Sequence, residues 1–143
     1  MLRKIGMLIG ACMMAAVLGA CGTEPGLSEE FITLDELNTF MEDGTGFIFV
    51  TAEPDAESYN KAKMPVEQAL LENDQSAIVF NVYMEDGKNL SNDNVNPYSD
   101  EELKINGLNY VKDGELVGAF QFSEYEGYDM EQGLSDFVKH IDQ

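Results

Sequence analysis

The fold is decided by residues 105–115, which read Ile-Asn-Gly-Leu-Asn-Tyr-Val-Lys-Asp-Gly-Glu. Within them Asp113-Gly114 separates two β-rich runs, Leu108–Val111 and Leu116–Phe122. An Asp-Gly pair in this setting is a strong hairpin signal, because a two-residue turn needs residues that accept a positive φ. The stretch therefore predicts an antiparallel hairpin in the second half of the chain.

Two apolar runs before the hairpin have the composition of buried strands. Phe47–Ala52 contains no polar alternation, and Ala77–Met84 has a similar composition, as expected for strands covered on both faces. A helix is predicted between them at Ala56–Glu72, following Pro54-Asp55. The apolar side of this helix is expected to comprise Met64, Ala69, Leu70 and Leu71.

The remaining elements complete a single α/β domain. Phe31–Leu34 is a short extended run, and Thr33 with Glu36 has the spacing of a capping box that begins a helix ending near Gly44. A final helix is predicted at Met130–Ile141, with Asp129 as its N-cap. The predicted order is βαβαβ, followed by a β-hairpin and a C-terminal helix.

This order resembles the thioredoxin fold over nearly all of residues 31–141. Phe47–Ala52 stands where that family has the central strand before its redox motif, and Pro65 stands where many members have a proline in the following helix. Residues 105–115 resemble the family's stretch of isoleucine, cis-proline, short strand and hairpin. Similar proteins include bacterial secreted thioredoxin-like and bacteriocin-accessory-like proteins.

The redox residues of the family are missing. Counting back from Pro65, the Cys-x-x-Cys positions fall on Glu57-Ser58-Tyr59-Asn60, and counting from Pro54 shifts them to Ala56 and Tyr59. Neither register supplies the thiolate that thiol–disulfide exchange requires. The cis-proline position falls on Asn106, where a cis bond would cost about 2.5–4 kcal/mol. We therefore expect no oxidoreductase activity.

The N-terminus reads as a bacterial lipoprotein signal. Arg3-Lys4 precedes an apolar run that ends in Leu18-Gly19-Ala20-Cys21, which resembles a lipobox. That resemblance implies cleavage before Cys21 and lipid attachment to it, on the outer side of the cytoplasmic membrane. The predicted organisation is a signal peptide at 1–20, a lipidated cysteine and tether at 21–28, and the domain at 29–143.

Charge limits the partners of the domain. The chain carries 8 basic and 27 acidic residues and a net charge of −19. Loss of Arg3 and Lys4 with the signal peptide leaves −21. Such a surface repels nucleic acid and anionic headgroups. A cationic partner or calcium is compatible with the same charge.

Two alternatives to a binding role stay open. A cell-envelope enzyme could use the carboxylates of Glu53, Asp55 and Glu57 as acid and base. Residues 92–100 have oxygen ligands spaced faintly like a calcium loop, although no central glycine is present. The lone histidine, His140, is expected on the surface near a helix C-terminus. No cofactor is expected.

The leading interpretation is a redox-inactive binding or accessory module that acts on an exported peptide or membrane protein. Redox members dock substrates over the Cys-x-x-Cys turn and the cis-proline loop, so the resemblance places binding there. A second candidate is the tyrosine-containing loop before the last helix, because tyrosine is enriched in binding surfaces. The candidate binding residues are Glu57, Ser58, Tyr59, Asn60, Asn106, Gly107, Tyr125 and Tyr128.

Overall fold

A computed structural model describes residues 24–85, 89–90, 98–125 and 127–141. The predicted signal peptide, Cys21, and most of the calcium-like loop at 92–100 lie outside these residues. The strands are β1 (Gly26–Phe31), β2 (Gly46–Thr51), β3 (Ser76–Asn81), β4 (Met84–Glu85), β5 (Asn89–Leu90), β6 (Gly107–Lys112) and β7 (Glu115–Gln121). The helices are α1 (Leu34–Asp43), α2 (Ala56–Glu72), the 3₁₀ turn η1 (Phe122–Glu124) and α3 (Gly127–His140).

Five strands form a mixed sheet in the order β1-β3-β2-β6-β7. The first three are parallel, with Phe47 of β2 paired to Ala77 of β3. β6 runs antiparallel to β2, and β7 returns antiparallel to β6. β2 is therefore the central strand, and its residues from Phe47 to Thr51 are all buried.

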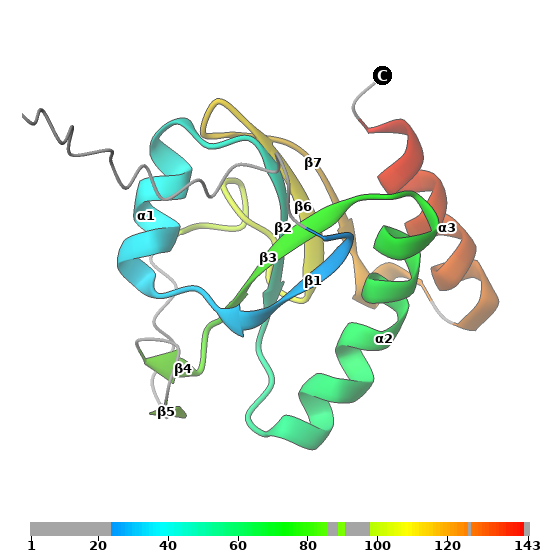
Figure 1. Ribbon diagram of the computed structural model, residues 1–143, viewed down its shortest axis with the longest axis horizontal. Helices are drawn as coiled ribbons and strands as arrows, with labels where there is room; N and C mark the ends of the chain where they lie inside the picture. The colour runs from blue at the N-terminus through cyan, green and yellow to red at the C-terminus, as the bar shows by residue number, and fades with distance from the viewer. Residues whose placement is uncertain (1–23, 86–88, 91–97, 126, 142–143) are drawn as a thin grey trace, which may run out of the picture.

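Helices cover both faces of the sheet, with α1 on one side and α2 and α3 on the other (Figure 1). The alternation of β2 divides the core accordingly. Phe47 and Phe49 join the cluster that includes Leu70 of α2 and Leu134 of α3. Ile48 and Val50 face the opposite way. Their cluster contains apolar residues of α1 and of the surrounding segments, which are Leu37, Phe40, Ile32, Phe80, Val82, Leu103 and Val111. The result is one α/β domain.

Local sequence signals are confirmed at three places. Thr33 caps α1 in a complete capping box with Glu36. α2 spans Ala56–Glu72 as predicted and continues through Pro65. The hairpin turns at Asp113 and Gly114, whose φ angles are 52° and 78°, the left-handed values that a turn of this kind requires.

The N-terminal boundary differs from the prediction. β1 begins at Gly26 and pairs in parallel with β3, so Gly26–Ser28 belong to the sheet and not to the tether at 21–28. β1 includes three consecutive polar residues, Ser28, Glu29 and Glu30, so its sequence alone does not indicate a strand. Its strand conformation depends on hydrogen bonding to β3, where Gly26 is in register with Ser76.

Two helix predictions were also wrong in detail. Met64 and Leu71 were expected on the apolar side of α2, but they are 67% and 55% exposed, and Val66 is buried with Ala69 and Leu70. α3 begins at Gly127, so Asp129 lies in its first turn and is not the N-cap. The predicted strand at Ala77–Met84 ends at Asn81.

Candidate functional site

The structure places Asn106, one of the predicted docking residues, at the end of β2, beside the segment that leads into α2. Asn106 precedes β6, and its Oδ1 accepts a hydrogen bond of 3.1 Å from the backbone N–H of Ala52, which follows β2. The carbonyl of Asn106 accepts a 3.1 Å bond from Phe122 at the start of η1. We call the residues 52–60 with Asn106 and Gly107 the sheet-end site.

The turn at Asn106-Gly107 has no cis bond, since every peptide bond in the described ranges is trans. Asn106 instead adopts a φ of 54°, a left-handed conformation that asparagine tolerates better than most residues. Gly107 is buried, and a Cβ there would stand 2.8 Å from the carbonyl oxygen of Phe120. The backbone conformation at Asn106 and the close approach at Gly107 therefore suit an Asn-Gly pair, and the Asn106 side chain adds its hydrogen bond to Ala52.

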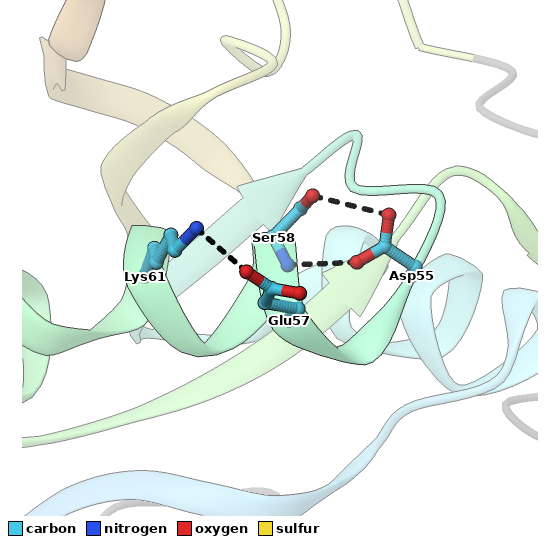
Figure 2. Close-up of polar contacts among 4 residues, drawn as sticks. All are labelled: Asp55, Glu57, Ser58 and Lys61. Atoms are coloured by element: carbon cyan, nitrogen blue, oxygen red, sulfur yellow. Dashed lines mark hydrogen bonds and ion pairs between the residues drawn. The ribbon is translucent and has the colours of Figure 1, made fainter.

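Helix α2 begins at the sheet-end site with a side-chain cap (Figure 2). Asp55 accepts bonds from the backbone N–H of Ser58 at 2.8 Å and from its hydroxyl at 3.1 Å. The backbone hydrogen bond from Ser58 is the main reason that the pKa of Asp55 is lowered from 3.8. In the first turn of the helix, Glu57 forms an exposed ion pair with Lys61 at 2.8 Å.

Tyr59 lies inside the fold more than the docking hypothesis expected. Its ring makes an edge contact with Phe31, with centroids 4.7 Å apart, and stacks at 6.4 Å from Phe49. Lys63 Nζ lies 5.7 Å from the ring centroid. Burial raises the pKa of Tyr59 to about 12, with a smaller contribution from Glu67. The ring therefore anchors the first turns of α2 to the sheet.

The two loop tyrosines are arranged differently from each other. Tyr125 stacks on Phe120, with centroids 4.3 Å apart and planes 18° apart, and its side chain is 40% exposed. Tyr128 lies in the first turn of α3 and is 74% exposed. Tyr125 thus packs on the sheet and presents only one side, whereas most of the Tyr128 ring is open.

Buried polar side chains that sequence reasoning missed support the backbone around this site. Asn81 Nδ2 donates to the carbonyl of Glu53 at 2.9 Å, and Asn109 bonds both the N–H and the carbonyl of Lys104. Thr51 Oγ1 is buried, and no partner for it lies within the described residues. A polar residue inside an otherwise apolar strand was the available signal for all three.

The carboxylates of Asp55 and Glu57 interact with neighbouring residues of α2. Asp55 caps α2, and Glu57 pairs with Lys61, so each of these carboxylates has a partner within α2. The described residues contain no cluster of three or more potential ligands for a metal ion. His140 lies at the end of α3, where its Nδ1 is 2.9 Å from the Asp136 carbonyl.

Comparisons with known proteins add no relative. No protein-family model matches the chain, no characterised protein sequence matches it, and no solved structure matches its fold. In the part of the chain that the structure describes, no helix has both the length and the apolar composition needed to cross a bilayer.

Proposed function

We propose that this chain is a lipid-anchored, redox-inactive thioredoxin-like module. It binds an exported peptide or a membrane protein on the outer side of the cytoplasmic membrane, with the sheet-end site as its docking surface. The observation that carries the proposal is the hydrogen bond from Ala52 N–H to Asn106 Oδ1. It holds the loop before β6 against the end of the central strand without a proline or a thiol.

The topology supports the thioredoxin-like part. Three parallel strands with the first at one edge, followed by an antiparallel hairpin at the other, match the arrangement that the resemblance implies. The first turn of α2 contains Glu57, Ser58, Tyr59 and Asn60, which correspond to the redox motif in one of the two registers that the resemblance implies. A carboxylate, a hydroxyl, a phenol and an amide can bind a ligand, but they cannot exchange a disulfide.

The anchor would keep the domain close to the membrane. Cys21 precedes Gly26, the first residue of β1, by five residues, which span at most about 18 Å when extended. A tether of this length confines the domain to a thin layer above the bilayer and raises its effective concentration toward membrane partners.

Photo-crosslinking from defined positions tests the docking surface. Benzoylphenylalanine would replace Glu57 or Asn60, which are exposed at the sheet-end site, and Asp35, which is exposed on α1, would serve as the control position. We expect one protein or peptide to be captured in membranes from both site positions and not from position 35. Equal capture from position 35, or no capture from 57 and 60, would contradict the proposal.

Metabolic labelling with an alkyne fatty acid tests the anchor separately. The wild-type protein should take up the label and fractionate with membranes, while Cys21→Ser should remain unlabelled and unprocessed. Labelling of the Cys21→Ser chain would show that Cys21 is not the lipidated residue.

A further inference from the structure

A groove between α2 and α3 presents exposed apolar side chains on the described surface. Its volume is about 580 Å³, and its apolar lining consists of Met64, Pro65, Leu71 and Met130. Met64 and Leu71 are seven residues apart on α2, so they lie on one side of the helix and about 10 Å apart along its axis. The core contains Val66 and Leu70 instead, so more than half of each of the Met64 and Leu71 side chains stays exposed.

Hydrogen bonds join the two helices that form the groove. Asn73 Nδ2 donates to Ser135 Oγ at 3.1 Å and to the Ser135 carbonyl at 3.4 Å, and Ser135 Oγ lies 3.4 Å from Glu72 Oε2. These contacts join the C-terminal end of α2 to the middle of α3, side by side in Figure 1. The groove is therefore preformed.

The polar rim of the groove is acidic. Glu67, Glu72 and Glu131 line it, and its one basic residue, Lys61, is paired with Glu57. The whole chain carries a net charge of −19, so the field at the rim is reinforced by the surrounding surface. An apolar floor with an acidic rim is complementary to an amphipathic segment whose polar face is basic.

We propose that the α2–α3 groove binds a cationic amphipathic helix of a partner. Leucine-type side chains spaced i, i+3 or i+4, and i+7 on that helix would contact Met64 and Leu71, and its lysines or arginines would face the glutamates of the rim. Methionine suits such a surface, because its unbranched side chain adapts to different apolar partners.

The groove lies close to the predicted lipid anchor. This part of the proposal rests on the proposed function and extends it. A Cβ at Gly26 would lie 3.5 Å from Leu71 Cδ2, so the start of β1 lies beside the groove. With the lipid on Cys21, the groove would face partners within the short reach of the tether. The partner is thus expected to be a basic amphipathic helix at the membrane surface.

The test is a titration of the full-length protein with a labelled model peptide, followed by fluorescence anisotropy. The peptide is a Lys/Leu amphipathic helix of about 14 residues, roughly four turns. A scrambled peptide of the same composition controls for charge alone. Met64→Gln with Leu71→Gln should weaken binding about ten-fold or more, while Val117→Gln, an exposed apolar position on β7, should not change it.

Two matched double variants test the electrostatic contribution to peptide binding. Glu67→Gln with Glu131→Gln should weaken binding and flatten its dependence on salt. Asp35→Asn with Glu42→Gln removes the same charge from α1 on the opposite face of the sheet and should have a much smaller effect. Equal effects of the two pairs, equal binding of the scrambled peptide, or no binding at all would overturn the proposal.

Two further measurements would reveal a different occupant of the α2–α3 groove, and either result would overturn the proposal. Sedimentation as a dimer that Met64→Gln with Leu71→Gln dissociates would assign the groove to a second copy. Crosslinking from position 64 to residues 1–20 would assign it to the chain's own leader. Because the titration can be repeated with the Cys21→Ser chain, a failure of lipid anchoring and a failure of groove binding are separate results.

Discussion

Thr51 is the last residue of β2, where the central strand leads into the sheet-end site. Its hydroxyl oxygen is buried, and no hydrogen-bond partner lies within the described residues. A buried hydroxyl without a partner loses its hydration and gains nothing in exchange. Thr51 is therefore a position where the core is less stable than an apolar side chain of the same shape would make it.

Replacement of Thr51 by valine should stabilise the protein. Thr51→Val removes the unpaired hydroxyl and keeps the branched shape, so we expect the free energy of unfolding to rise by about 1 kcal/mol. Urea denaturation measures the change. Thr51→Ser, which keeps the hydroxyl and loses the methyl group, should be less stable than wild type. A loss of stability in Thr51→Val would mean that the hydroxyl is hydrogen-bonded.

Tyr59 should make the protein sensitive to alkaline pH. Its folded pKa of about 12 lies above the ordinary value of 10.0 because burial disfavours the phenolate. The neutral phenol stabilises the fold fully below pH 10, and this contribution is lost as pH rises toward 12.

The test compares wild type with Tyr59→Phe. The urea midpoint of unfolding is measured for each protein between pH 10 and pH 12. Wild type should lose stability relative to Tyr59→Phe, because phenylalanine keeps the contacts with Phe31 and Phe49 and cannot ionise. Parallel curves for the two proteins would show that Tyr59 ionises equally easily in the folded and unfolded states.

At the scale of elements, the hairpin between β6 and β7 is connected to the rest of the fold by its turn. Gly114 has a φ of 78°, and its N–H donates to the carbonyl of Gly44 at 2.9 Å. A Cβ at this position would lie 2.5 Å from the Met41 carbonyl oxygen and 2.7 Å from that of Glu42. The turn therefore docks against the C-terminal end of α1 only because residue 114 is glycine.

Gly114→Ala should cost about 2 kcal/mol of stability, since it adds backbone strain to steric overlap. Asp113→Asn is the matched control, because asparagine also accepts the left-handed conformation, and it should change stability by less than about 0.5 kcal/mol. Chemical denaturation of both variants checks the prediction. A wild-type midpoint for Gly114→Ala would show that the turn can move away from α1.

Local signals predicted the elements well wherever the deciding contacts are close in sequence. Thr33 with Glu36, Asp55 at the start of α2, and Asp113-Gly114 all act within a few residues. The start of β1 was predicted wrongly as part of the tether, because its polar sequence becomes a strand only beside β3.

At the scale of the whole molecule, the net negative charge is the main electrostatic feature of the protein. With 27 acidic and 8 basic residues, repulsion among surface carboxylates opposes the compact state at neutral pH. Salt shortens the range of this repulsion, from about 10 Å at 0.1 M ionic strength to about 3 Å at 1 M.

The melting temperature at pH 7 should therefore rise by a few degrees when sodium chloride is raised to about 1 M. The control is the same series near pH 4.1, the isoelectric point calculated from the sequence, where the salt effect should largely disappear. A melting temperature that falls with salt at pH 7 would show that attractive ion pairs outweigh the repulsion.

The sequence by itself determined the α/β order of elements, the capping box of α1, the hairpin turn and the acidic surface, because each depends on composition or on residues within a few positions. The family resemblance, and not the residues by themselves, is the basis for the prediction that Asn106 and residues 57–60 form one candidate site. Only the tertiary structure decided that Tyr59 packs on Phe49, that Asn106 bonds Ala52, and that Met64 and Leu71 stay exposed. These outcomes depend on which face of each helix meets the sheet, and that is set by contacts between segments far apart in the chain.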